Sequence, residues 1–208
     1  IPTTWTNSGV NGAGLPMANA VWEYRGSSTT PSLSIGSRGA YSGQQLPILS
    51  PTGTNGFVIF DSDYLHTYGL PGNLGNGPAP APHKSSLTTP VINLALYPEV
   101  ELKLNSYTRF FEGKALILFS INGGSTWSDT IVAHPDVFVN ASNARNSVIS
   151  FNVSSIIGGE ANVRIRFLYD GTFDDPGASG SGSALYFWMI DDIVLSEMPK
   201  HEIRFTKW

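Results

Sequence analysis

The sequence predicts an all-β fold, a β-sandwich, on three observations. Apolar and polar residues alternate with a period of two in several short segments, as in strands with one buried face. No segment shows the 3.6-residue period of an amphipathic helix. Gly (22 residues) and Pro (14 residues) separate the apolar segments, as turns between short strands require. Strands joined by turns without intervening helices indicate two packed sheets.

At least six strands are expected. Residues 1–50 are expected to add two or three more, and INGGSTW (121–127) is expected to form the tip of a hairpin. Alternation places one set of side chains in the core: Val100, Leu102 and Leu104 in one segment, and Val163, Ile165 and Phe167 in another, with Arg164 and Arg166 outward. Continuous apolar runs predict more deeply buried strands at 56–61, 115–121, 148–153 and 184–195.

Three long connections separate these strands, at 24–54, 61–90 and 170–183. The segment 61–90 is so rich in Gly and Pro that we expect no regular structure there, and connections of that length are usually functional. Asp170, Asp174 and Asp175 in the third connection are interpreted as turn residues, with a second bound ion as the alternative. We expect one domain over residues 1–196 and a tail, edge strand or linker over 197–208.

Composition limits the function. Charged residues make up 13% of the 208, and a net charge of −4 leaves no basic stripe for nucleic acid. No run approaches the 18 apolar residues of a membrane span. Without cysteine the chain has no disulfide or thiolate metal site, so a bound ion is a natural substitute in a secreted domain. Because the chain begins without a signal peptide, we expect an excerpt of a processed or larger secreted or cell-surface protein.

The segment YFWMIDDIVL (186–195) contains two adjacent carboxylates, Asp191 and Asp192, inside a strongly apolar run. Trp188 and Ile190 are out of phase with the pair at 193 and 195, so all four can face one core only if a β-bulge shifts the strand at the two acids. A bulge frees backbone carbonyls, which together with carboxylates are the ligands that calcium prefers. A solvated strand end is the alternative.

Three segments carry a resemblance to a known family. LTTPVINL (87–94), FSINGGSTW (119–127) and FWMIDDIVL (187–195) resemble, in that order, the signature segments of the cleaved-adhesin modules of Bacteroidetes surface proteins, which occur in gingipain haemagglutinin regions and are similar to MAM domains. The opening IPTTWTNSG followed by VWEY (21–24) resembles their usual start. The chain differs at Asn122, where an acid is common, and in its long 61–90 segment.

The resemblance implies a jelly-roll sandwich of the galactose-binding-like type, stabilised by calcium and exported. It also implies that an acid in the first half meets the late Asp-Asp pair, which carries over to Asp61 and Asp63 beside Asp191 and Asp192. Such modules serve as adhesion or carbohydrate-associated units, so the expected partners are a glycan or a host or cell-surface protein and the neighbouring domains of a larger chain. Zinc is not expected, because the four histidines are scattered.

Sugars stack on exposed aromatic faces, so Tyr64, Tyr68 and Trp22, on or near long connections, are the candidate glycan contacts. A non-catalytic adhesion or carbohydrate-binding module is the leading prediction, because the chain lacks Cys and a G-x-S-x-G nucleophile motif. A structural spacer or accessory module of a secreted peptidase or glycosidase is the alternative. A glycosidase using two acids, for example Glu112 and Asp129, is the third hypothesis.

Overall fold

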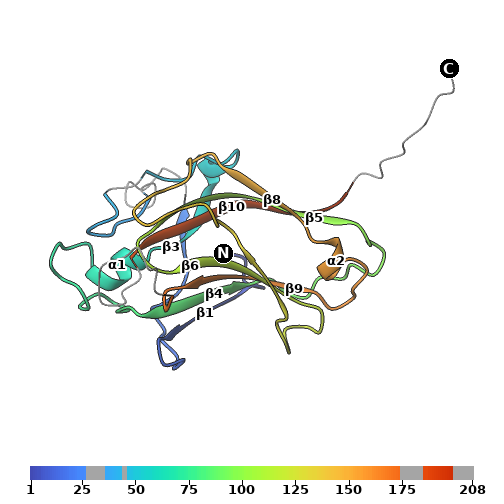
Figure 1. Cartoon of the computed structure of the whole chain (residues 1–208), viewed down its shortest axis with the longest axis horizontal. Helices are drawn as coiled ribbons and strands as arrows, with labels where there is room; N and C mark the ends of the chain where they lie inside the picture. The colour runs from blue at the N-terminus through green and yellow to red at the C-terminus, as the bar shows by residue number, and fades with distance from the viewer. Residues whose placement is uncertain (27–35, 44–45, 174–184, 199–208) are drawn as a thin grey trace, which may run out of the picture.

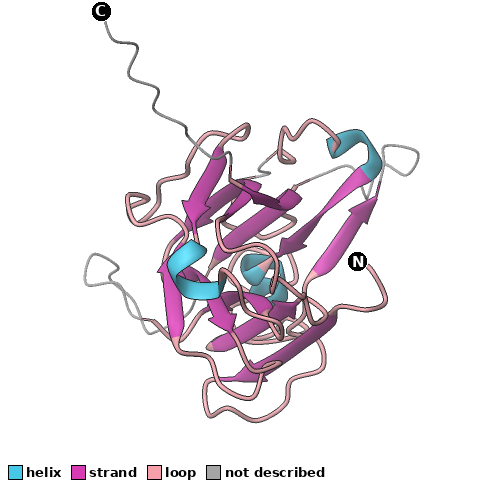
Figure 2. Cartoon of the chain, turned by 90° about the vertical axis from the view of Figure 1, so that its right-hand side faces the viewer, coloured by secondary structure: helices cyan, strands magenta, loops and turns pink. Residues whose placement is uncertain are grey.

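The computed structural model describes residues 1–26, 36–43, 46–173 and 185–198. Within them, ten strands form two antiparallel sheets of five strands that pack face to face (Figure 1, Figure 2). The strand orders are β1-β4-β9-β6-β7 and β2-β3-β10-β5-β8, so the chain passes repeatedly from one sheet to the other. This jelly-roll sandwich confirms the fold class predicted from the sequence.

The two sheets contain strands of very different length. The first holds β1 (Thr6–Asn11), β4 (His83–Thr88), β9 (Arg164–Asp170), β6 (Lys114–Ser120) and β7 (Asp129–Val132). The second holds β2 (Glu23–Gly26), β3 (Gly56–Phe60), β10 (Tyr186–Glu197), β5 (Val100–Phe110) and β8 (Val148–Asn152). The helices α1 (Ser62–Thr67) and α2 (Ser154–Ile157) lie toward opposite ends of the sandwich (Figure 1).

The main core lies between the sheets. The side chains predicted to face inward on β5 and β9 are buried there, which confirms both alternation patterns. Large aromatic side chains dominate this core, and the ring centroids of Trp22 and Trp188 lie 5.3 Å apart in an edge-to-face arrangement.

A second apolar cluster covers the outer face of the second sheet and contains Ile48, Phe57, Ile59, Tyr107, Phe187 and Met189. Segments around residues 48 and 145 lie over it, where the Leu49 amide donates to the Arg145 carbonyl at 2.9 Å and Arg145 Nε donates to the Pro47 carbonyl at 2.7 Å. Strand β3 and the first half of β10, as far as Ile190, are therefore buried on both faces. That burial explains why their sequences are continuous apolar runs instead of alternating ones.

The segment 61–90 differs from the prediction, because α1 and β4 both lie within it. Strand β4 was missed because its inward residues include His83 and Ser85, so its sequence lacks an apolar alternation. Strand β8 was expected to be deeply buried, yet it lies at the edge of its sheet and its side chains are partly or fully exposed. Asp174, Asp175 and the tail from residue 199 lie outside the described residues.

Candidate binding site

The predicted bulge is present in β10. Pairing with β5 is regular as far as Asp191 opposite Asn105, and it resumes at Val194 opposite Lys103, so β10 contains one extra residue. Asp192 has a φ of 47°, a left-handed conformation that aspartate tolerates better than most residues. Ile190 before the bulge and Ile193 after it both pack against the main core, which confirms the phase shift inferred from the sequence.

The two bulge carboxylates hold the segment that leads into β3. Asp191 accepts a hydrogen bond from the Ser50 hydroxyl, and Asp192 accepts one from the Thr52 hydroxyl and another from the Thr52 amide at 3.3 Å. Partial burial raises the pKa of the Asp191 carboxyl, and the neighbouring Asp192 raises it further. Both acids are partly exposed, so each retains oxygen lone pairs that an external donor can reach.

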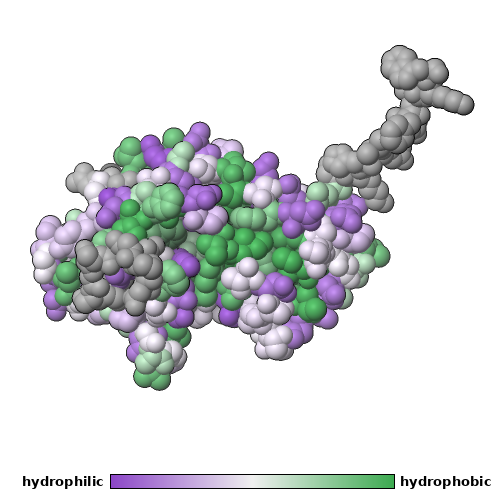
Figure 3. Space-filling model, viewed as in Figure 1, coloured by the Kyte–Doolittle hydropathy of each residue, from purple (hydrophilic) through white to green (hydrophobic). Residues whose placement is uncertain are grey.

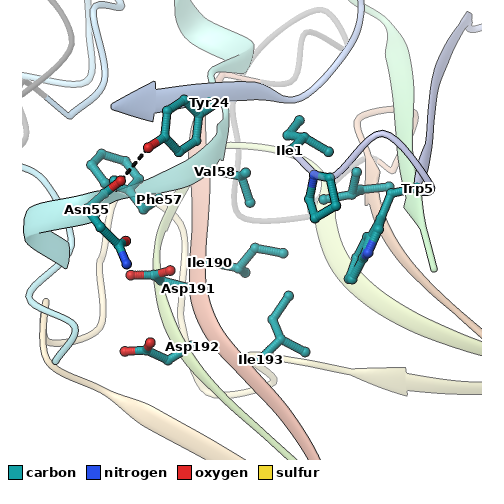
Figure 4. Close-up of a pocket in the computed structure, with 13 residues that line it drawn as sticks. Ile1, Trp5, Tyr24, Asn55, Phe57, Val58, Ile190, Asp191, Asp192 and Ile193 are labelled. Atoms are coloured by element: carbon teal, nitrogen blue, oxygen red, sulfur yellow. Dashed lines mark hydrogen bonds between the residues drawn. The ribbon is translucent and has the colours of Figure 1, made fainter. Parts of the chain in front are cut away.

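A cavity of about 510 Å³ opens beside the bulge (Figure 4). Its apolar walls include Val58, Ile190 and Ile193, and its polar groups at one end are Asn55, Asp191 and Asp192. Trp5 and Tyr24, which are both partly exposed, also line it, as does the buried Phe57. Figure 3 shows hydrophobic side chains gathered between the two sheets on the face where the chain begins.

The side chains of Trp5 and Tyr24 are both held in place by contacts with neighbouring residues. The Trp5 ring stacks on Phe167, with centroids 6.2 Å apart and planes 13° from parallel, so one of its faces is covered by the core. Tyr24 is 48% exposed, and its hydroxyl donates to the Asn55 carbonyl. The cavity thus combines preset aromatic rings, an apolar wall and several hydrogen-bond acceptors, which is the usual composition of a small-ligand site.

Asp61 and Asp63 lie at the end of β3 and the start of α1, and both are buried. Asp61 accepts hydrogen bonds from the Ser37 hydroxyl at 2.6 Å and the Arg38 amide at 2.8 Å, and it pairs with Arg25 Nη2 at 3.3 Å. Asp63 accepts hydrogen bonds from the backbone amides of residues 41 and 42, at 2.7 and 2.5 Å. Burial raises the pKa of both carboxyls. Because these oxygens already accept from protein donors, the pair stabilises the 36–43 segment.

The structure does not bring the two predicted acid pairs together. Asp61 follows the end of β3 that pairs with Trp188 of β10, whereas Asp191 follows the β10 residue opposite Val58, nearer the other end. Four residues of strand separate the two places, about 13 Å. Among the described residues, no three His, Cys, Asp or Glu side chains are grouped so that they could hold a metal ion. The expectation that Asp61 or Asp63 meets Asp191 and Asp192 at one ion is therefore corrected, and an ion held by Asp191 and Asp192 alone is left as a proposal.

The three predicted aromatic contacts differ in exposure. Trp22 is 2% exposed and packs in the core, so it offers no surface to a ligand, and that prediction is corrected. Tyr64 and Tyr68 lie side by side on α1, with centroids 5.5 Å apart and planes 32° from parallel. The Arg38 guanidinium lies 3.9 Å from the Tyr64 ring centroid, and Tyr68 is 57% exposed. These two rings form an aromatic surface at a different place from the cavity.

Two Ser–His hydrogen bonds are present, Ser62 to His83 at 2.8 Å and Ser106 to His134 at 2.7 Å. Both serines are fully buried, so neither hydroxyl can meet a substrate as the structure stands. Glu112 is also buried, whereas Asp129 is exposed. These two carboxylates therefore do not face a shared cleft, which a two-acid glycosidase needs.

Comparison with known proteins finds likeness in fold only. No family model matches the sequence, and no curated protein matches it. The K1 cleaved adhesin domain of Lys-gingipain from Porphyromonas gingivalis is 12% identical with a TM-score of 0.43, the alignment covering 96% of this chain and 94% of that one. The K3 domain of the same protein is 13% identical with a TM-score of 0.48, at 94% and 92% coverage. TmCBM61, solved with β-1,4-galactotriose, is 12% identical with a TM-score of 0.43, at 94% and 90% coverage.

Sequence reasoning missed Trp5, Tyr24 and Asn55 as parts of the cavity. They come from three separate segments, and only the pairing of β2 with β3 and of β3 with β10 brings two of them near the bulge. The bulge acids were the one local signal for this site. None of the helices in the described residues is long and apolar enough to cross a membrane.

Proposed function

We propose that this protein is a non-catalytic glycan-binding module of a secreted or cell-surface protein, and that the cavity beside the β10 bulge is its binding site. The observation that carries the proposal is the combination in one open cavity of Trp5, Tyr24 and the polar group Asn55, Asp191 and Asp192. A sugar presents an apolar C–H face and a rim of hydroxyl groups. The aromatic rings suit the face, and the carboxylate and amide oxygens suit the hydroxyls.

A second place for the same function is the Tyr64–Tyr68 surface on α1. It is favoured by the exposure of Tyr68 and by the contact of Arg38 with Tyr64, which holds that ring in place. A paired aromatic surface without a cavity suits a longer, flatter glycan or a protein surface. Variants that separate the two places therefore decide which of them binds.

Structural calcium remains part of the proposal at the bulge alone. Asp191 and Asp192 supply two adjacent carboxylates, and their known protein partners are two hydroxyl groups and one amide, none of which carries positive charge. An ion there would stabilise the junction of β10 with the 50–52 segment. The residues alone give at most part of a calcium shell, so backbone carbonyls or water would have to complete it.

The proposal is tested by screening the folded chain on a glycan array and titrating any glycan found. Asp192→Asn keeps a side chain that tolerates the left-handed backbone and removes the charge, so it should weaken binding in the cavity by about tenfold. Tyr68→Ala is the matched control and should leave that affinity unchanged. The opposite pattern assigns the glycan to the α1 surface. A blank array together with a blank screen of cell-surface proteins would favour the structural spacer module.

A further inference from the structure

The outer face of the first sheet carries a group of basic side chains, on the opposite side of this sheet from the core side chains Leu87 and Phe167. Strand β9 is central in this sheet, between β4 and β6, and its residues Ile165, Phe167 and Tyr169 point into the core. Arg164 and Arg166 therefore point outward, as the alternation predicted, about 7 Å apart along the strand. Lys84 on β4 and Lys114 on β6 flank the same strand on either side of Asp170.

Arg166 is held in a fixed orientation. Its guanidinium carbon lies 3.8 Å from the Trp127 ring centroid, and its Nε donates to the Thr88 hydroxyl at 3.3 Å. Gly124 lies against the same group, since a Cβ at that position would be 3.3 Å from Arg164 Cδ and 3.5 Å from Trp127 Cζ2. The hairpin tip between β6 and β7 thus packs on both arginines and positions them.

Neither arginine is neutralised. In the described part of the chain, the ion pairs involve Arg25, Arg38 and Lys84, and none involves Arg164 or Arg166. The Nε of Arg164 is buried and has no hydrogen-bond partner there. Outward-pointing guanidinium groups that are held in place without an acidic partner are prepared to bind an external oxyanion, because each offers parallel N–H donors.

The charge of this face opposes that of the whole chain. Its four basic residues and the single acid Asp170 sum to +3, within a chain of net charge −4. Around the arginines the outward positions of β1 and β4 are hydroxyl residues, Thr6, Ser8, Ser86 and Thr88. The outward positions between the arginines and Asp170 are the half-buried Leu116, Leu118 and Leu168, and Val132 beside them is 38% exposed. Cations and hydroxyl groups beside a short apolar strip suit an acidic polysaccharide, which presents oxyanions, hydroxyl groups and apolar C–H faces.

We propose that Arg164 and Arg166, positioned by Trp127, form a binding site for the oxyanion groups of an acidic polysaccharide on the outer face of the first sheet. The bound group is the carboxylate of a uronic acid or a sulfate ester, either of which matches a guanidinium fork. Ser8 and Ser86 lie on the same face and are accessible to hydrogen-bond the sugar hydroxyls, whereas Thr88 is buried and holds Arg166. The site is independent of the cavity glycan proposed above and does not need that proposal to hold.

The test is affinity electrophoresis and calorimetry of the folded chain with three probes: polygalacturonate, dextran sulfate and uncharged dextran. We expect binding to one or both acidic polymers and none to uncharged dextran. Arg166→Gln and Arg164→Gln should each weaken it by about tenfold or more, because each removes a charged donor group. Lys103→Gln removes the same charge from the second sheet and should change affinity less than twofold. Arg166→Lys keeps the charge but loses the fork, so it should bind less well than the wild type.

Binding of polygalacturonate alone identifies a carboxylate site, and binding of dextran sulfate alone identifies a sulfate site. The proposal is overturned if neither acidic polymer binds, if uncharged dextran binds equally, or if Lys103→Gln weakens binding as much as Arg166→Gln. Equal affinity for a DNA duplex would overturn the carbohydrate assignment. Circular dichroism confirms that each variant is folded, and Asp192→Asn should retain full affinity for the acidic polymer even if the cavity proposal fails.

Discussion

Replacing Arg25 by Met should strongly destabilise the protein, because it leaves a buried carboxylate without its cation. Arg25 of β2 and Asp61, which follows β3, are each 2% exposed and lie 3.3 Å apart, and Arg25 also pairs with the more exposed Glu23. In the Met variant Asp61 keeps its hydrogen bonds from Ser37 and the Arg38 amide but has no buried positive charge beside it. Breaking one side of a buried pair typically costs about 3–5 kcal/mol, which for a domain of this size lowers Tm by about 6–20 °C.

The loss should depend on pH in a defined direction. Burial already raises the pKa of Asp61 above its ordinary value of 3.8, and removal of Arg25 should raise it further. The folded variant then binds a proton at a higher pH than the unfolded chain does. The deficit relative to the wild type is therefore greatest near neutral pH and shrinks as the pH falls toward the raised pKa.

Chemical denaturation of both proteins at several pH values measures this deficit. Arg38→Met is the matched control: its side chain is 28% exposed and pairs with Glu23 near the surface, so it should cost no more than about 1 kcal/mol. The double variant Arg25→Met with Asp61→Asn should recover part of the loss. The reasoning is refuted if Arg25→Met costs no more than the control, or if its deficit stays constant from neutral to acidic pH.

Three further predictions follow from other contacts. Burial lowers the pKa of His134 to about 4 from an ordinary 6.5, so the unfolded chain binds a proton there at a higher pH than the folded protein does. As the pH falls from 6.5 to 4, the wild type should therefore lose stability relative to His134→Asn, as measured by denaturation. Gly39→Ala should destabilise the fold more than Gly53→Ala, because a Cβ at Gly39 would lie 2.2 Å from Asp63 Cγ; melting temperatures decide this. If calcium binds at the bulge, a chelator should lower Tm and calcium should restore it, by about 2.7 kcal/mol at a hundredfold excess over Kd. Asp192→Ala should abolish that response, and a wild type insensitive to both reagents would exclude the ion.

The sequence predicted those strands whose burial repeats locally. The alternation at Val100, Leu102 and Leu104 identified β5, and the phase slip around Asp191 located the bulge within one residue. The hairpin tip expected at 121–127 is confirmed, since β6 and β7 pair on either side of it. Strand β4 was missed because its inward positions include polar residues, so no apolar period marks it. Its strand structure depends on pairing with β1 and β9, which no local pattern encodes.

The candidate sites were less predictable than the fold because each is assembled from distant segments. Composition alone indicated no basic surface, yet pairing across three strands places Lys84, Lys114, Arg164 and Arg166 on one face. The predicted role of Trp22 failed because an aromatic residue near a long connection can equally fill the core, and its neighbour Trp188 is 166 residues away in the chain (188 − 22). Whether one aromatic side chain is exposed depends on contacts with residues that are distant in the sequence, so the local sequence does not predict it.

The position of β10 has a consequence for the order in which the protein can be completed. This strand lies between β3 and β5, so both of them gain a partner on that side only when residues 186–197 are present. A nascent or truncated chain ending before residue 186 leaves the facing edges of β3 and β5 unpaired and lacks Trp188 and Ile190 of the main core. The second sheet can therefore close only after β10 has been synthesised, and until then its unpaired edges make the chain prone to aggregate.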